Sequence, residues 1–84
     1  MFTGILFKNA RLIHPDRVEP ADLRIADGRI AAVGPNLQPQ PGDEIQMLGW
    51  RFLKGRLKAG AAANFSILTD EGEVLATFIK GHRI

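Results

Sequence analysis

The sequence predicts an all-β protein, a small β-sandwich or barrel. Three observations lead to this prediction. Short apolar runs are separated by five prolines and nine glycines, which is typical of domains with many strands. Several runs alternate apolar and polar side chains, as half-buried strands do. No segment keeps a helical period over a window of about 11 residues.

Length and composition indicate one globular domain, residues 1–84. A chain of 84 residues buries a small core, and its 45% hydrophobic and 24% charged residues are ordinary for a folded protein. The chain has no cysteine, which excludes disulfides, thiolate nucleophiles and cysteine-bound zinc.

Charge and hydropathy give little reason to expect a nucleic acid or a membrane as partner. The net charge is +2 and the signs alternate along the chain, so we expect no nucleic-acid binding. No apolar run approaches the roughly 20 residues that span a bilayer. The first residues lack the basic start and cleavage site of a signal peptide, so we expect a cytoplasmic protein.

The first half of the chain predicts a long strand and a hairpin. Residues 4–13 are apolar with interspersed polar side chains and form the expected first strand, and 14–17 form a turn with Pro15. Residues 21–26 and 29–34 are apolar runs on either side of Asp27-Gly28. Such a dipeptide favours a tight turn with positive φ, so the two runs should pair as a hairpin.

The second half predicts shorter strands. Three prolines exclude residues 35–42 from a sheet. The closing segment, residues 73–80, has apolar side chains on both faces and is therefore expected to be a central strand. The other elements expected are strands at 43–47, 51–53 and 63–68 and a turn at 69–72.

The predicted core takes its large apolar side chains from both halves of the chain. The first half contributes Ile5, Phe7, Leu12, Leu23, Ile25, Ile30 and Val33. The second half contributes Phe65, Ile67, Val74, Leu75, Phe78 and Ile79.

Two parts of the sequence carry a family resemblance. KNARLI (residues 8–13) and LRIADGRIAAVG (23–34) resemble the opening of amidohydrolase-superfamily enzymes, which are metal-dependent hydrolases. GRLKAGAAANF (55–65) and VLATFIKGHRI (74–84) are similar to the superfamily's C-terminal pattern and final strand. Asn64 and the short final segment are most similar to N-acetylglucosamine-6-phosphate deacetylases, and dihydroorotases share much of the pattern.

The resemblance implies a fold made by both chain ends. In the superfamily these two segments form a composite β-sandwich, and a catalytic (β/α)₈ barrel of about 200–400 residues lies between them in sequence. Here the N-terminal segment (1–53) continues directly into the C-terminal segment (54–84) at Leu53-Lys54-Gly55, with no residues left for a barrel. The resemblance therefore implies a sandwich from which the barrel has been deleted, by engineering.

We accordingly expect a non-catalytic structural domain with no cofactor and no metal. The superfamily's hydrolysis needs a cluster of histidine and carboxylate ligands, and none of its catalytic or metal-binding positions transfers onto this chain. The alternative is a natural small β module that binds a protein partner through an exposed edge or an apolar patch. A barrel-free sandwich should also expose apolar surface near Trp50 and Phe52, and so self-associate.

The remaining candidates for chemistry favour structural interpretations. His14 and His82 are expected to face solvent as polar residues, not to bind metal. Gly55 and Gly60 lack the Gly-Lys-Ser/Thr ending of a phosphate loop. Ser66 has no histidine near it in sequence and is a weak candidate nucleophile.

Two charged groups complete the candidates. Asp70, Glu71 and Glu73 could hold a cation, but a solvated turn is the preferred interpretation. Lys54, Arg56 and Lys58 alternate, so on a strand they would form one positive face. Trp50 and Phe52 lie close by in sequence. We interpret them as core or former barrel-contact residues, not as stacking platforms for bases.

Overall fold

The computed structural model describes residues 4–84, which form one eight-stranded mixed sheet and contain no helix. The sheet order is β3-β2-β1-β5-β6-β7-β8, with β4 beside β1. Residues 4–84 accordingly include no helix that could cross a membrane. The strands are β1 (Ile5–Ile13), β2 (Val18–Ala26), β3 (Arg29–Gly34), β4 (Glu44–Met47), β5 (Phe52–Gly55), β6 (Phe65–Leu68), β7 (Val74–Ile79) and β8 (His82–Arg83).

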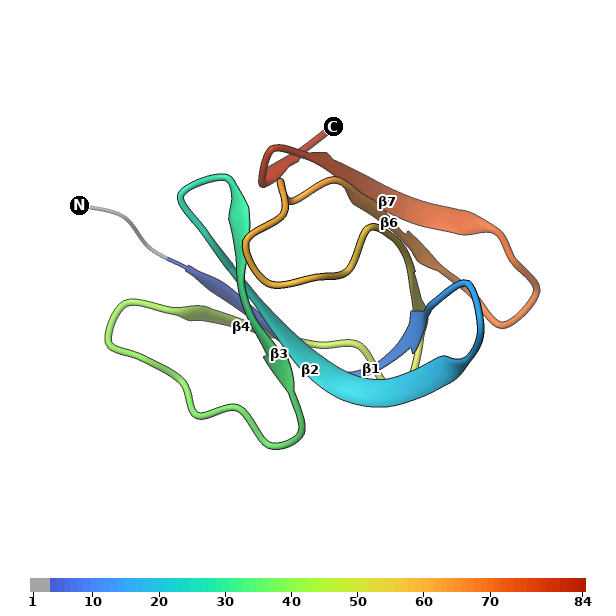
Figure 1. Cartoon of the computed structure of the whole chain (residues 1–84), viewed down its shortest axis with the longest axis horizontal. Coiled ribbons are helices and arrows are strands. Elements are labelled where there is room, and N and C mark those ends of the chain that lie inside the picture. The colour runs from blue at the N-terminus through green and yellow to red at the C-terminus, as the bar shows by residue number, and fades with distance from the viewer. Residues whose placement is uncertain (1–3) are drawn as a thin grey trace.

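The sheet curls so that its two ends face each other, as Figure 1 shows for β2–β3 and β6–β7. The start of β3 meets the segment that precedes β6. Ile30 N donates to Ala61 O at 2.8 Å, and Ala63 N donates to Gly28 O at 2.9 Å. A curled sheet with an enclosed core confirms the predicted all-β, sandwich-like fold.

The predicted hairpin is confirmed at its turn. Ala26 pairs with Arg29, so Asp27 and Gly28 are the two loop residues, with φ of +54° and +73°. Positive φ at both positions defines the turn type that matches strand twist. Gly28 also lies against the C-terminal segment, where a Cβ on it would stand 2.9 Å from Lys80 O.

The segment Leu53-Lys54-Gly55 lies inside a strand in the middle of the sheet. β5 pairs in parallel with β1, with Leu53 opposite Leu12, and antiparallel with β6, with Leu53 opposite Ile67. Leu53 is fully buried. At Gly55 the neighbouring strand approaches closely, because a Cβ there would stand 2.6 Å from Asn64 O.

β7 has a neighbouring strand on each edge, as predicted for 73–80, but its two apolar faces are not both buried. β7 pairs with β6 along its length, but β8 covers only Phe78 and Ile79 on its other edge. Val74 is 61% exposed and Leu75 is 47% exposed. The inner face of β7 packs on the core through Phe78, whereas the described residues place no second layer over its outer face.

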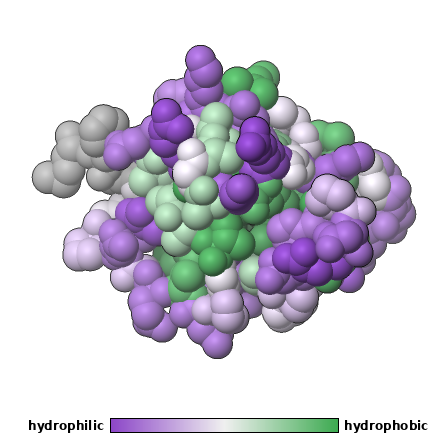
Figure 2. Space-filling view, viewed as in Figure 1, coloured by the Kyte–Doolittle hydropathy of each residue, from purple (hydrophilic) through white to green (hydrophobic). Residues whose placement is uncertain are grey.

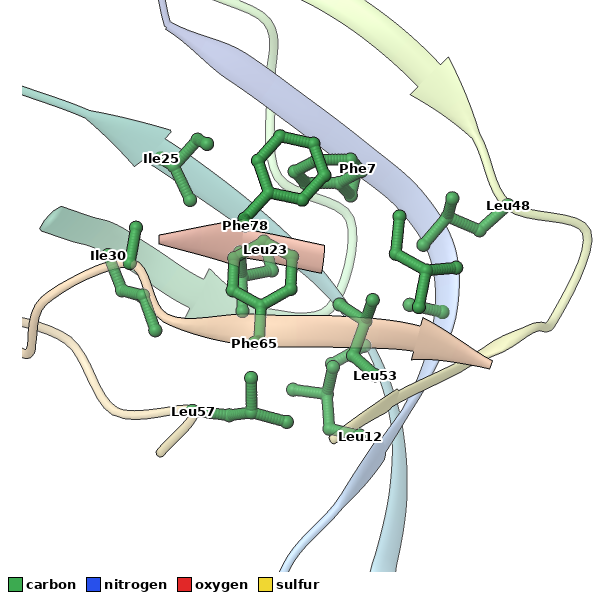
Figure 3. Packing of buried hydrophobic residues seen from close by; sticks show 14 residues of the cluster. Phe7, Leu12, Leu23, Ile25, Ile30, Leu48, Leu53, Leu57, Phe65 and Phe78 are labelled. Atoms are coloured by element: carbon green, nitrogen blue, oxygen red, sulfur yellow. The ribbon is translucent and has the colours of Figure 1, made fainter. Parts of the chain in front are cut away.

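Three phenylalanines form the centre of the core, and they come from both halves of the chain (Figure 3). The ring of Phe7 meets Phe65 and Phe78 edge to face, with centroids 5.6 and 5.5 Å apart. Phe65 and Phe78 stack at 5.1 Å. Such aromatic pairs stabilise the fold by more than their buried area alone would. Because the contacts join Phe7 to Phe65 and Phe78, the two halves of the chain share one core.

Most of the predicted core is confirmed. Ile5 and Val33 are partly buried at its margin, and Val74, Leu75 and Ile79 were wrongly included because they lie on the uncovered face of β7. Leu48, Leu53 and Leu57 were missed, and two of them, Leu48 and Leu57, lie in connections that follow no strand pattern. The buried cluster is Phe7, Ala10, Leu12, Ala21, Leu23, Ile25, Ile30, Leu48, Leu53, Leu57, Ala63, Phe65, Ile67 and Phe78.

A pair of glycine substitutions tests the contact between the hairpin turn and the C-terminal segment. Gly28→Ala and Gly72→Ala both place a Cβ on a residue with positive φ, but nothing lies within 4 Å at Gly72. Both should show backbone strain of about 1–2 kcal/mol. Gly28→Ala should be destabilised by about 1 kcal/mol more, because the added methyl meets Lys80 O. Urea unfolding measures both, and equal losses would contradict the contact.

Candidate functional site

The structure brings no metal-ligand cluster together within residues 4–84, where no three His, Asp or Glu side chains could jointly hold an ion. His82 is exposed on β8, as expected. The expectation that His14 faces solvent is wrong, because its side chain is only 16% exposed. The hairpin of β1 and β2 places Glu19 beside it, with Nε2 of His14 3.0 Å from Oε1 of Glu19.

The other candidate groups have structural roles. Ser66 Oγ lies 3.2 Å from Thr77 Oγ1 on the neighbouring strand, where β6 and β7 pair. Asp70 and Glu71 lie in the exposed turn between β6 and β7. Asp70 accepts a hydrogen bond from Nη2 of Arg11 at 2.6 Å, so this acidic turn is tied to β1.

Arg11 connects the first strand to the middle of the chain. Its Cζ atom lies 4.2 Å from the centroid of the Phe52 ring, and its Nε donates to Trp50 O. Trp50 has a φ of +67° and is 49% exposed, so the core alternative is wrong for it. Phe52 lies on the outer face of β5 and is partly exposed, because Arg11 covers only part of its ring.

Asp22 is a buried carboxylate that holds three parts of the chain together. It accepts hydrogen bonds from Lys8 Nζ at 2.8 Å and from the backbone N–H groups of Asn9 and Leu37, each at 3.0 Å. Asn9 lies in a bulge of β1 with a φ of +59°. Burial alone would raise the pKa of Asp22, but these hydrogen bonds and the Lys8 charge hold it below its ordinary value.

A second carboxylate anchors the far end of the same loop. Both oxygens of Asp43 accept from Arg24, with the Nη2 contact at 2.9 Å, and Gln40 N donates to Oδ2 at 2.8 Å. The hydrogen bonds from Arg24 and Gln40 lower the pKa of Asp43. Leu6, which pairs with Arg24 on the outer face, is fully buried there although it is outside the core cluster.

A basic hollow opens where the hairpin meets the segment before β6. Its volume is about 510 Å³, and Arg29, Arg56 and Lys58 line it together with Asn64 and the backbone around Gly60. The expectation that Lys54, Arg56 and Lys58 form one strand face is wrong, because β5 ends at Gly55. We call this feature the basic hollow.

Apolar surface is also exposed. On the face in Figure 2 it gathers at the centre, over β3 and the alanine-rich segment before β6, and hydrophilic side chains surround it. A further group follows β7 and β8, where Val74, Leu75, Ile79 and Ile84 are all substantially exposed. Within residues 4–84, the other large apolar side chains that are about half exposed or more are Val18, Ile45, Met47 and Trp50.

Comparison with known proteins supports a relationship at the level of the amidohydrolase superfamily and no finer assignment. The chain is 37% identical over 42 residues to dihydropyrimidinase 2 of Caenorhabditis elegans. The matched segment is 50% of this chain and 8% of that protein, so the chain spans a small part of its relative's length. No protein-family model matches the chain.

The two anchoring carboxylates predict a loss of stability in acid. Both folded pKa values are lowered, so the stabilisation is complete above the ordinary pKa of 3.8 and is lost as the pH falls from there through the folded values. Asp22→Asn and Asp43→Asn should lower stability near neutral pH and reduce the additional loss in acid.

Urea unfolding at a series of pH values between about 6 and 2 measures this dependence. Asp16→Asn is the matched control, because Asp16 is an exposed carboxylate beside Arg17. It should leave the acid loss of the wild type unchanged. If Asp22→Asn and Asp43→Asn lost as much stability in acid as the wild type, the carboxylates would not be its source.

Proposed function

We propose that this chain is the non-catalytic structural β-sandwich domain of an amidohydrolase-type enzyme, lacking the catalytic barrel. The observation that carries the proposal is the 37% identity to dihydropyrimidinase 2 over half of the chain. The parent enzyme would belong to the N-acetylglucosamine-6-phosphate deacetylases, which the C-terminal segment resembles most, with dihydroorotases as the alternative.

The arrangement of the core supports a composite domain. Phe7 belongs to the N-terminal segment, whereas Phe65 and Phe78 belong to the C-terminal segment, and the three rings are in contact. The two segments also meet at the turn Asp27-Gly28, which packs on Lys80 and Gly81. A splice that joins two such segments through the ordered strand β5 is compatible with deliberate removal of a barrel.

The side-chain chemistry of residues 4–84 supports a structural role. Hydrolysis by a metal-bound water needs several ligands at one open site. His14 is paired with Glu19 at the β1–β2 turn, and His82 lies on the short last strand. Neither histidine has a group of carboxylates around it that could complete a ligand set.

Metal content and hydrolysis test the non-catalytic role. After dialysis against buffer without chelator, the purified chain should retain far less than one zinc per chain, and added zinc should produce no hydrolysis of dihydropyrimidine or N-acetylamino-sugar substrates. Elemental analysis and a product assay measure both. One tightly held zinc per chain together with zinc-dependent turnover would overturn the proposal.

A second candidate function is protein binding through exposed apolar surface, and the outer face of β7 and β8 favours it. Phe78 points into the core, so Ile79 points away from it, and Ile84 N donates to Thr77 O at 2.9 Å. The register shift between β6 and β7 pairs Val74 with Leu68, beside the core residue Ile67, so Val74 also lies on this outer face with Ile79 and Ile84. We propose that a second copy of the chain covers this face when no barrel does.

Sedimentation at several concentrations tests self-association. The wild-type chain should associate as its concentration rises. Ile79→Lys should weaken association roughly tenfold or more, since an unpaired ammonium group would be buried at the interface. Met47→Lys is the control, because Met47 is exposed on β4, away from β7 in the sheet order. A wild-type chain that stays monomeric, or equal effects of both substitutions, would contradict the interface.

A further inference from the structure

We propose that the basic hollow binds the doubly charged phosphate group, either as free phosphate or as a phosphate monoester. The proposal depends on the residues that line the hollow and is independent of the amidohydrolase relationship.

Backbone hydrogen bonds fix the shape of the hollow. Gly60 N donates to Ile30 O at 2.8 Å, and Ile30 N donates to Ala61 O at 2.8 Å. Ala61 N closes the turn onto Lys58 O at 3.0 Å. The hollow is therefore formed by backbone held between the N-terminal hairpin and the C-terminal segment, and the small side chains at 59–62 leave its volume of about 510 Å³ open.

The lining concentrates positive charge without a counterion. Arg29, Arg56 and Lys58 all line the hollow, and none of its lining residues is acidic. None of these three cations forms an ion pair with any residue in the described range 4–84, whereas Lys8 and Arg24 are each paired with an aspartate. Three like charges around one hollow repel one another, and a bound anion relieves that repulsion.

Two of the donors are held in position. Nη1 of Arg29 donates to Gly60 O at 3.1 Å, which fixes its guanidinium beside the turn. Oδ1 of Asn64 accepts from Lys80 N at 2.7 Å, which fixes the side-chain amide and leaves its Nδ2 group as a donor. Within residues 4–84 that Nδ2 group has no acceptor.

The donor set matches a tetrahedral oxyanion. Two guanidinium groups, one ammonium group and the Nδ2 group of Asn64 are all donors, and arginine binds phosphate oxygens through its paired N–H groups. Three cations match the double negative charge of a phosphate group better than the single negative charge of a carboxylate ligand. No aromatic side chain lines the hollow, so it lacks the platform on which the bases of a nucleic acid would stack.

Titration of the full chain with inorganic phosphate tests the site. In amide NMR spectra at low ionic strength, the signals of Gly60, Ala61, Ala62 and the Asn64 side chain should shift and saturate. Arg56→Gln and Lys58→Gln should each weaken binding about two- to fivefold, the effect of one exposed charge pair. Lys54→Gln removes the same charge from β5 outside the hollow and should change binding less than about twofold.

Two further titrations identify the ligand. Sodium chloride at matched ionic strength controls for screening and should produce no saturable shifts. Phenyl phosphate distinguishes a phosphate monoester from free phosphate as the ligand. If phenyl phosphate binds as tightly as inorganic phosphate, the hollow accepts a phosphate monoester. If it binds more weakly, the free ion is the ligand. Shifts that do not saturate, that chloride reproduces, or that Arg56→Gln, Lys58→Gln and Lys54→Gln alter equally would overturn the proposal. Circular dichroism confirms that each variant is folded.

Discussion

The pairing of β5 on both of its edges is the interaction on which the rest of the structure depends. β5 bonds to β1 in parallel and to β6 antiparallel, and Leu53 is fully buried between Leu12 and Ile67. Without β5, the ladder of β1 to β3 and the ladder of β6 to β8 would be joined only by the hydrogen bonds between the start of β3 and the segment before β6. Neither ladder alone would enclose the three-phenylalanine cluster, because Phe7 lies on one and the other two rings lie on the second.

The outer face of the sheet is organised by charge. Asp22 and Asp43 hold the connection between β3 and β4 against the sheet, and each carboxylate is bonded both to a basic side chain and to backbone N–H groups. Leu6 is fully buried on this face, and the backbone N–H of Asn9 in the bulge of β1 donates to Asp22. The basic hollow is the opposite case, since its cations have no acidic partner within residues 4–84 and remain available to a ligand.

Local features of the fold could be predicted from the sequence, and features that depend on distant residues could not. Asp27-Gly28 determines its turn through its own backbone preferences, so the hairpin follows from the dipeptide. The apolar pattern of β7 suggested burial on both faces, but only the position of the strand near the sheet edge decides how much is covered. The basic hollow was missed because Arg29 joins Arg56 and Lys58 only after the sheet has curled.

The parallel alignment of β1 with β5 also affects how the chain folds. Residues 11–13 must find residues 52–54, so this ladder forms only after a long loop has closed. The hairpins of β1 to β3 and of β6 and β7 close short loops and can form first. Contacts between residues far apart in the sequence slow folding. Domains rich in such contacts fold in about milliseconds to seconds. Until β5 is in place, the edges of β1 and β6 remain open to pairing with other chains.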